Sequence, residues 1–421
     1  MTGGSTTLGV RDLPERPALA RLVGDDLESF ATKAWGQAPW LRSTERGEGV
    51  GDLSDLFSPA AVDELVSTRG LRSPFLRMAK DGTTLGDTTF TSGAGAGATI
   101  SDQVNEDRLL RLFADGATMV LQALHRVWPP LVDFGQQLAA DLGHPVQVNA
   151  YVTPPQARGF SDHYDVHDVF VVQVQGEKRW YIHEPVHPAP LRDQPWTARR
   201  AAVEQSAATD PVLDVVLRPG DCLYLPRGYL HAATALGGVS THLTIGVHTW
   251  HRQHLAQQLT RHALARLADD EQVRASLPLG VDVGDPDELG PEIAWVRERL
   301  VEAVRAVPDE QLLGALAALA RDQQRPAPLG PLAQLDAAAR VSQQSRVAAR
   351  AHVRPELTTG ADGCLLVRSR SGQLTVAAAR RAGLERALAG PPVAVAELLD
   401  DPAEAVALAR DLLRAGLVVP A

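Results

Sequence analysis

The chain has 421 residues, of which 44% are hydrophobic and 22% charged, as is usual for soluble globular proteins, and no apolar run reaches the roughly 18 residues of a membrane span. Its formal net charge of -10 at pH 7 argues against broad binding to nucleic acid and is compatible with a basic protein partner. Because residues 1–17 lack a basic-then-apolar signal pattern and the chain has two cysteines, Cys222 and Cys364, we expect a reduced, cytoplasmic protein without a Cys-based metal site.

The first part of the chain is predicted to be an arm followed by helices. Residues 1–30 read as an N-terminal arm, and residues 27–41 show an amphipathic pattern that predicts a helix. The stretch 82–99 is rich in Gly and Thr, which favours a flexible surface loop over a lid above a site. Between 107 and 143 apolar residues recur at helical spacing, and Pro129-Pro130 divides this segment into two expected helices.

From about residue 145 the apolar period changes to two, which is typical of strands. Residues 145–155 predict a strand that ends at prolines, and residues 168–183 predict a hairpin of two β-rich runs around Gly176-Glu177. Three short strands joined by turns that contain Pro and Gly are expected over 214–236, and a further strand over 239–250. Several short strands with tight turns indicate an antiparallel barrel or jelly roll.

After residue 250 the pattern becomes helical and then mixed. Apolar residues at helical spacing predict a helix bundle, whose exposed apolar face would fit a dimer interface or would only pack against the barrel. The C-terminal part predicts a hairpin, helices and a terminal strand, as in a winged-helix domain. Since residues 352–421 contain eight Arg and eight Asp plus Glu, we expect packing or protein recognition there and not DNA binding. The expected domains are 1–250, 251–350 and 351–421.

Side chains that bind metals gather just before the apolar run of the 168–183 segment. His163 and Asp165 are two residues apart, so on an extended strand both would point to the same face. His231 lies 68 residues further on, after another predicted strand and turn. A His-x-Asp pair with a distant His is the pattern of the two-His-one-carboxylate triad, which binds iron(II) and leaves three positions open. The alternative for the pair alone is a polar turn that leads into a strand.

Other histidines of this region have competing interpretations. His167 is a possible further ligand, but we expect it to lead into the next strand or to line the substrate mouth. On the last expected barrel strand, Thr241 and His242 have opposite parity, so only one of them can face the interior. We favour Thr241 as the residue that faces the pocket.

A family resemblance is carried by two stretches, "NAYVTPPQARGFSDHYDVHDVFVVQVQGEKRWYIH" and "GDCLYLPRGYLHAATALGGVSTHLTIGVH". They resemble the JmjC-type ribosomal oxygenases, which are cupin-barrel oxygenases dependent on iron(II) and 2-oxoglutarate. The resemblance extends over residues 27–250, and the later segments match that family's three-part layout more loosely. It implies an α+β multidomain fold: a double-stranded β-helix (the cupin or JmjC jelly roll), then an α-helical dimerisation-type bundle, then a winged-helix-like C-terminal domain.

The resemblance assigns a cofactor and a co-substrate to particular residues. Carried over position by position, it implies that His163, Asp165 and His231 bind Fe(II). Lys178 matches the lysine that pairs with the distal carboxylate of 2-oxoglutarate, a task that suits an ammonium group. Without the family, Lys178 would read as a surface lysine whose stem lies on apolar neighbours.

Three further residues are expected to line the 2-oxoglutarate pocket. Tyr151 matches a tyrosine whose hydroxyl contacts the same carboxylate, and Asn149 matches a pocket residue near the metal. Thr241 completes this set through its expected inward orientation. Gly246 stands where some relatives have a small hydroxyl residue, so the resemblance leaves the substrate residue open.

The implied activity is the hydroxylation of an Arg or His side chain in a ribosomal protein, with 2-oxoglutarate and dioxygen as co-substrates. A basic ribosomal partner suits the acidic chain, and the family layout implies a homodimer formed through the helical domain, without DNA or membrane. One alternative is the same chemistry on a peptide natural product or a small molecule. Others are a non-catalytic cupin that binds a partner and a DNA-binding regulator that uses the C-terminal module.

Overall fold

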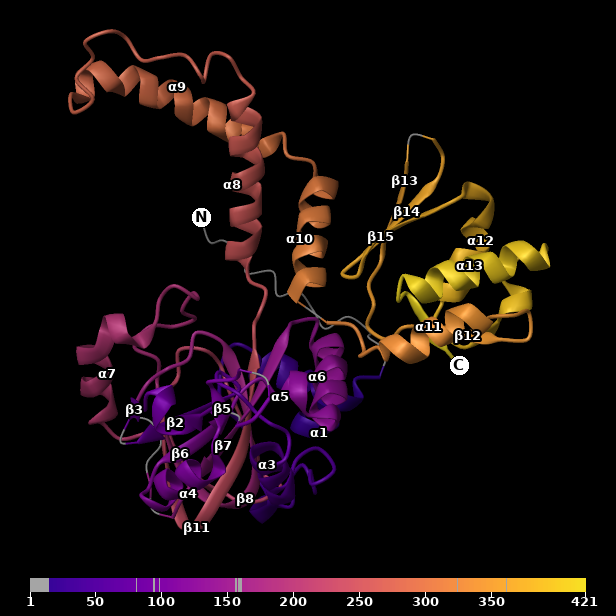
Figure 1. Cartoon of the computed structure of the whole chain (residues 1–421). Helices are drawn as coiled ribbons and strands as arrows, with labels where there is room; N and C mark the ends of the chain where they lie inside the picture. Colours follow the sequence, from indigo (N-terminus) through magenta and orange to yellow (C-terminus); the bar gives the residue numbers. More distant parts are fainter. Residues whose placement is uncertain are drawn as a thin grey trace. The chain divides into compact units, whose positions relative to one another are not determined.

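The computed structural model describes residues 15–80, 82–93, 95–97, 99–155, 157, 161–323, 325–360 and 362–421 (Figure 1). Residue contacts divide the chain into two compact units, Met1–Thr249 and Trp250–Ala421. Residues 1–14 of the expected N-terminal arm and parts of the expected 82–99 loop lie outside the described residues. Every helix in the described ranges is too short or too polar to cross a membrane.

The first unit is built on a nine-stranded sheet whose pairings are antiparallel. Its strands are β1 (Trp40–Arg42), β2 (Leu76–Lys80), β3 (Thr83–Thr84), β6 (Thr118–Leu121), β7 (Val146–Thr153), β8 (Asp168–His183), β9 (Leu213–Leu217), β10 (Cys222–Leu225) and β11 (Leu230–Val247). The order across the sheet is β1-β10-β8-β11-β7-β6-β2-β3, and β9 also pairs with β8. Strands distant in the sequence are therefore neighbours, as in a jelly roll.

The long strands β8 and β11 pair with each other over both of their halves. The first half of β8 also pairs with β10, and its second half also pairs with β9. Between the halves, Gly176 has a φ of +64°, and a Cβ there would lie 2.2 Å from the carbonyl oxygen of Val239. The expected hairpin at Gly176-Glu177 is therefore wrong, because this glycine lets a single strand bend. The strands expected on either side of Gly237-Gly238 are likewise one strand, β11.

We expect Gly176→Ala to lower the free energy of unfolding by about 3 kcal/mol or more, because its Cβ meets backbone at a φ that strains L-residues. Urea denaturation measures this change. The matched control is Gly237→Ala, since Gly237 has a φ of +68° but nothing lies within 4 Å of an added Cβ. That control should lose only about 1 kcal/mol. Equal losses in the two variants would contradict the role of Gly176 in the bend.

Alternate residues of β8 face two different hydrophobic clusters, as the period of a strand requires. Phe170 and Val172 belong to the largest cluster, in which helices of the first unit pack on one face of the sheet and contribute residues such as Phe30. Val169 and Val171 belong to a second cluster on the other face. The helices of this unit are α1 (Pro17–Val23), α2 (Leu27–Lys33), α3 (Pro59–Ser67), α4 (Glu106–Ala114), α5 (Leu124–Val127), α6 (Pro129–Leu142) and α7 (Arg200–Ala207). Residues on the second face, such as Val169 and Val171, line a cavity inside this unit.

In two regions the helices are shorter than the apolar spacing of the sequence predicts. The helix expected over 27–41 ends at Lys33, and the chain continues into β1 at Trp40. The 107–143 segment contains α4, α5 and α6, but β6 interrupts it, so the expectation of two helices is wrong there. All four residues of β6, "TMVL", are buried. A strand buried on both faces shows no alternation, so its apolar run is not distinguishable from a helix by period.

The second unit begins with three helices, as the pattern after residue 250 predicts: α8 (Arg252–Ala268), α9 (Pro286–Arg305) and α10 (Asp309–Gln323). A small cluster of Ala263, Ala303 and Val307 joins α8 to α9. The rest consists of α11 (Pro331–Arg340), β12 (Arg346–Ala349), β13 (Glu356–Thr359), β14 (Leu365–Ser369), β15 (Gly372–Val376), α12 (Arg381–Leu388), β16 (Val393–Ala394), α13 (Pro402–Arg414) and β17 (Val418–Pro420). These later elements share one hydrophobic cluster and form two three-stranded sheets, β16-β12-β17 and β13-β14-β15.

Candidate metal and co-substrate site

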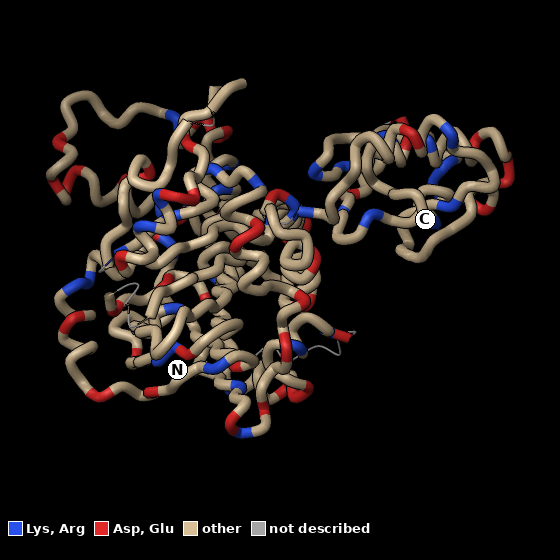
Figure 2. Tube along the Cα trace, turned by 60° about the horizontal axis from the view of Figure 1, so that its bottom comes forward, with Lys and Arg blue, Asp and Glu red and all other residues tan. Residues whose placement is uncertain are grey.

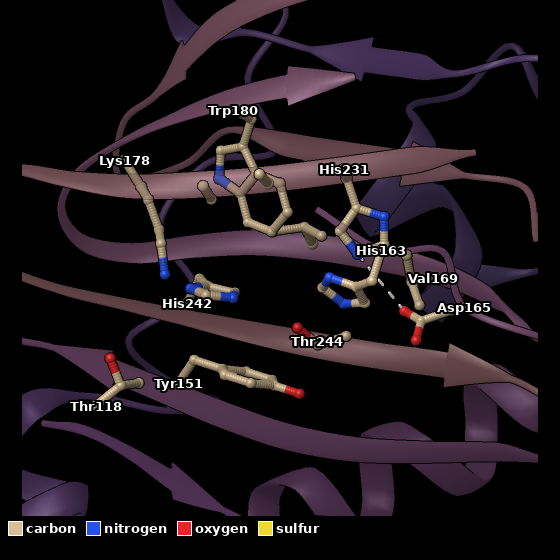
Figure 3. Close-up of a pocket in the computed structure, with 13 residues that line it drawn as sticks. Thr118, Tyr151, His163, Asp165, Val169, Lys178, Trp180, His231, His242 and Thr244 are labelled. Carbon is tan, nitrogen blue, oxygen red and sulfur yellow. Dashed lines mark ion pairs between the residues drawn. The ribbon is translucent and has the colours of Figure 1, made fainter. Parts of the chain in front are cut away.

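The structure brings His163, Asp165 and His231 together at one end of a cavity inside the first unit (Figure 3). One potential ligand atom from each residue lies within 4.8 Å of the other two. Two backbone hydrogen bonds join the histidines, because the N–H of His231 donates to the His163 carbonyl at 2.8 Å and the reverse bond is 3.3 Å. This bridge places the loop before β8 against β11. It therefore brings together two histidines that are 68 residues apart in the sequence.

Both histidine rings are oriented by carbonyl groups behind them. Nδ1 of His163 lies 2.7 Å from the carbonyl oxygen of Ser161, and Nδ1 of His231 lies 3.1 Å from that of Tyr229. A carbonyl oxygen only accepts, so each Nδ1 must donate, and each Nε2 keeps its lone pair. On His231, Nε2 lies 3.8 Å from Oδ2 of Asp165. This second layer of hydrogen bonds is the usual support of metal-binding histidines.

The electrostatics of the cluster suit a divalent cation. Burial, together with the neighbouring His163, lowers the pKa of His231 to about 4, so this imidazole is neutral at pH 7. Burial raises the pKa of Asp165, but the charges of His167, His231 and His163 outweigh it, and the net shift is downward. An ionised carboxylate with two imidazole groups is a donor set for a borderline divalent metal.

The opposite end of the same cavity contains Lys178, from the second half of β8 (Figure 3). Lys178 is only 4% exposed, and burial lowers its pKa to about 7. Its Nζ donates to Oγ1 of Thr153 at 3.1 Å and lies 5.9 Å from the ring centroid of Trp180. Among the described residues no carboxylate forms an ion pair with it. A buried ammonium without a counter-ion calls for an anionic ligand.

Two more buried donors near Lys178 have no hydrogen-bond partner among the described residues. They are Nδ1 of His242 and Nε1 of Trp180, and both side chains line the cavity. The His242 ring stacks on Tyr151, with ring centroids 5.0 Å apart and an interplanar angle of 5°, and lies edge-on to Trp180. Burial raises the pKa of Tyr151 to about 12, so its hydroxyl remains a donor. Buried polar atoms are rarely left unsatisfied, which indicates that a ligand accepts from them.

The structure separates the other two residues that were expected in the 2-oxoglutarate pocket. Asn149 lies on the same face of β7 as Tyr151, but its Oδ1 accepts from the N–H of Ala123 at 3.0 Å, and it lines a neighbouring hollow. Thr241 is buried and donates to Oε1 of Gln175 at 3.1 Å. The expectation for Thr241 is wrong, because His242 lines the cavity in its place.

The polar or aromatic cavity residues that the sequence reasoning missed are His242, Trp180, Thr118 and Thr244. His242 pairs directly opposite Tyr151 across β7 and β11, and residues directly opposite each other share a face. The register of these two strands therefore identifies His242 as the residue that faces the cavity. The alternation of side chains within β11 alone does not contain this information. A register shift between Thr241 and His242 on the β8 side further disturbs simple alternation.

A second hollow of about 290 Å³ adjoins the metal end of the cavity, with which it shares Tyr151, Asp165 and Thr244. His167 lines this hollow and lies outside the cluster of His163, Asp165 and His231. Its position directly before Asp168, the first residue of β8, agrees with the expectation that it leads into the next strand.

Comparison with known proteins connects this fold and site to a family. Residues 133–255 match the JmjC domain family. The chain is 28% identical over 262 residues to an Aedes aegypti protein named bifunctional lysine-specific demethylase and histidyl-hydroxylase, covering 61% of this chain and 38% of the relative. It is 29% identical over 256 residues to ribosomal oxygenase 1 of Gallus gallus, covering 60% and 40%. The chain thus spans well under half the length of these relatives.

Solved structures show the same fold. The crystal structure of the Escherichia coli ribosomal oxygenase YcfD matches with a TM-score of 0.54 at 16% identity and covers 93% of this chain and 97% of that one. Its complex with cobalt and 2-oxoglutarate matches with a TM-score of 0.52 at 17% identity, covering 95% and 99%. The fold and the JmjC match define this chain as a JmjC-domain protein with a cupin-type barrel. The likeness to proteins named ribosomal oxygenase agrees with the family resemblance that the motifs carry.

Proposed function

We propose that the chain is an Fe(II)- and 2-oxoglutarate-dependent dioxygenase that hydroxylates a protein side chain. The observation that carries the proposal is one cavity with a two-His-one-Asp cluster at one end and, at the other, a buried lysine that pairs with no carboxylate in the described part of the chain. A ligand with a chelating keto acid at one end and a carboxylate at the other matches both ends. YcfD, which shares this fold, has been crystallised with cobalt and 2-oxoglutarate.

In this proposal His163, Asp165 and His231 hold the iron through two Nε2 atoms and one carboxylate oxygen. Three ligands on one side leave the remaining positions for the keto acid and dioxygen. When bound, iron(II) supplies the redox chemistry that converts 2-oxoglutarate and dioxygen to succinate and carbon dioxide and inserts a hydroxyl into a substrate C–H bond. Ser161 and Tyr229 keep the two imidazole rings in the required tautomer through their carbonyl groups.

Lys178 binds the distal carboxylate of the co-substrate, and Thr153 orients its amine. His242 Nδ1 donates to the same carboxylate, which supplies a partner for a buried donor that has none among the described residues, and the Tyr151 hydroxyl is a further donor in this cavity. Asn149 acts more indirectly in this proposal, because it holds the backbone of Ala123 beside the metal end. Apolar side chains such as Val169 and Val171 line the cavity and exclude water from it.

The affinity for 2-oxoglutarate is expected to fall as the pH rises above about 7. Burial lowers the pKa of Lys178 to about 7, and only the protonated amine pairs with a carboxylate. Above that pH binding must add a proton, so Kd should rise by about tenfold per pH unit, while below it this group contributes no slope. Isothermal titration calorimetry checks the trend, and Lys178→Met should lack it. A Kd that stays constant between pH 7 and pH 9 would contradict the assignment.

The proposed substrate is an Arg or His side chain of a basic ribosomal protein. The chain carries a net charge of -10, and several relatives are named ribosomal oxygenase or histidyl-hydroxylase. Figure 2 shows basic and acidic residues interspersed along the C-terminal part, which fits the equal count over 352–421. This balance supports protein recognition and not DNA binding for a winged-helix-like domain over 351–421. We place this function in the cytoplasm.

A homodimer through the helical domain, 251–350, is part of the proposal. The helices α8 to α10 expose large apolar side chains, with exposed fractions between 42% and 63%: Leu255, Leu264, Ile293, Val296, Val301 and Leu313. Apolar faces of this kind are usually covered by a partner. Light scattering should therefore give twice the 45.1 kDa chain mass, and replacing Ile293 and Val296 with Asp should give the monomer mass. If the wild-type protein has the mass of a monomer, the proposed homodimer is wrong.

The test of the whole proposal is anaerobic titration of the iron-loaded protein with 2-oxoglutarate. A weak visible charge-transfer band should appear, because a keto acid chelates the open positions of such a triad. The band should be absent in His231→Ala, which retains the rest of the cavity. Iron binding without the band would leave a metal-binding cupin of another kind and would remove the role of Lys178.

A further inference from the structure

The 290 Å³ hollow beside the metal end has a lining that discriminates between the two proposed target residues. It adjoins Asp165, and the far end of the main cavity is assigned to the co-substrate, so the hollow is where a target side chain would reach the metal. Its walls come from β2, the segment after β6, β7, the loop before β8, and β11. The lining residues are Arg77, Gln122, Ala123, His125, Gln147, Asn149, Tyr151, Asp165, His167 and Thr244.

Among these lining residues, Arg77 and Asp165 are the two with permanent charges. Asp165 belongs to the metal cluster, so its charge is used there. Arg77 lies opposite Val120 on β6, which lies opposite Tyr151 on β7, and its guanidinium hydrogen-bonds to Tyr151. Its Nε is buried and has no hydrogen-bond partner among the described residues. A cationic target side chain would therefore face a fixed guanidinium in a partly desolvated space.

The other polar lining groups form hydrogen bonds with the backbone or contact one another. Nδ1 of His125 accepts from the N–H of Val148 at 3.0 Å, and an imidazolium has no accepting nitrogen, so this ring is uncharged. Nδ1 of His167 lies 3.3 Å from the Asp168 carbonyl oxygen and must donate to it. Its Nε2 lies 3.4 Å from Nε2 of Gln147, so the two side chains are in contact in the wall of the hollow. Carboxamides supply the remaining donors and acceptors.

Gly246 makes the contact between Gln147 and His167 possible. A Cβ at Gly246 would lie 3.0 Å from Cγ and Nε2 of Gln147 and 3.0 Å from Cε1 of His167. A side chain at this position would require the pair to shift by a few tenths of an ångström, because these distances are shorter than ordinary carbon contacts. The contact between Gln147 and His167 thus depends on a glycine at this position.

We propose that this hollow selects a neutral, hydrogen-bonding side chain, an imidazole in preference to a guanidinium, and that Arg77 and the Gln147–His167 pair over Gly246 make the selection. The inference rests on the proposed function and narrows its substrate from Arg or His to His. The acidic surface then attracts a basic protein, while the hollow rejects a basic target residue.

The first experiment maps the hydroxylated residue. Ribosomal proteins of the source organism are incubated with the iron-loaded protein, 2-oxoglutarate and ¹⁸O₂, and labelled residues are located by mass spectrometry. We expect the label on His. Label on Arg or Lys would overturn the inference and leave the proposed function standing. If no protein is labelled and 2-oxoglutarate is not consumed, the proposed function fails, and the binding measurement below decides the inference.

That measurement uses two small probes, 4-methylimidazole and methylguanidinium. With manganese(II) and 2-oxoglutarate bound, a probe in the hollow should show paramagnetic broadening of its proton signals. Asp165→Ala, which loses the metal, supplies the baseline. We expect broadening of 4-methylimidazole at a concentration at least tenfold lower than that of methylguanidinium. Equal or stronger broadening of methylguanidinium would overturn the inference.

Two variants assign the selection to the named residues. Gly246→Ser should weaken 4-methylimidazole binding at least tenfold and leave the 2-oxoglutarate Kd unchanged, because it displaces Gln147 and His167. The matched control is Gly238→Ser, since nothing lies within 4 Å of a Cβ there. Arg77→Gln should reduce the preference for 4-methylimidazole over methylguanidinium, whereas Arg77→Lys should retain it. An unchanged preference in Arg77→Gln would remove Arg77 from the selection.

Discussion

Asp165→Ala is expected to lose iron binding and to lose more than about 100-fold in turnover while the fold remains stable. Loss of groups that only support metal ligands already reduces affinity or activity by about 10- to 100-fold, so loss of a ligand should exceed that. Asp165 lies in a loop beside two imidazoles and outside both hydrophobic clusters of β8. Its removal therefore affects the metal and not the packing.

The matched control is Asp168→Ala, three residues further on. Asp168 is fully buried and accepts from the Tyr224 hydroxyl at 2.6 Å and from the Arg227 N–H at 3.0 Å. Removing it leaves these donors unsatisfied, so this variant should lose stability. Metal content and thermal unfolding of both variants separate the two effects. An Asp165→Ala protein that binds iron as tightly as the wild type would refute the metal assignment.

Lys178→Met should raise the Kd for 2-oxoglutarate by about 100-fold or more and leave iron binding unchanged. Breaking a buried ion pair by removal of one partner costs about 3–5 kcal/mol, which corresponds to a factor of this size or larger. Methionine has a similar length and no charge. In the absence of co-substrate the variant should be as stable as the wild type or more stable, since a buried unpaired amine has been removed.

Lys80→Met is the control for this variant, because Lys80 is one of only three lysines and forms an ion pair with Asp115 at the surface. It should leave both affinities unchanged. Calorimetric titrations of the two variants with 2-oxoglutarate supply the comparison. If Lys178→Met binds 2-oxoglutarate like the wild type, the anchor of the co-substrate lies elsewhere.

Local patterns predicted those parts of the molecule that local chemistry determines. The spacing of His163 and Asp165, with His231 after a later turn of the expected barrel, indicated the cluster, and the family resemblance assigned its three residues. The helices after residue 250 also followed from apolar spacing. In each case the evidence lies within a short window of sequence.

The expectations that were wrong depended on contacts between distant segments. Gly176 looked like a hairpin turn because a left-handed glycine serves a turn and a bend equally well. Only its approach to Val239 distinguishes the two. The choice between Thr241 and His242 likewise required the pairing of β11 with β7, and β6 was hidden inside a helical pattern by burial on both faces. Strand register is a tertiary property that a short window does not contain.

The pairing of β8 with β11 also fixes the distance between the two residues that are proposed to hold the ends of the co-substrate. Lys178 pairs with Ala235, and His231 pairs with Ile182. Along β8, Lys178 and the partner of His231 are therefore four residues apart. At the usual rise of a strand, the backbone positions of the two anchors are about 13 Å apart. A hydrogen-bonded ladder does not stretch, so the distance between the two anchors is built into the sheet. A keto diacid one carbon shorter than 2-oxoglutarate would reach only one anchor at a time, and chain length becomes a criterion of selection.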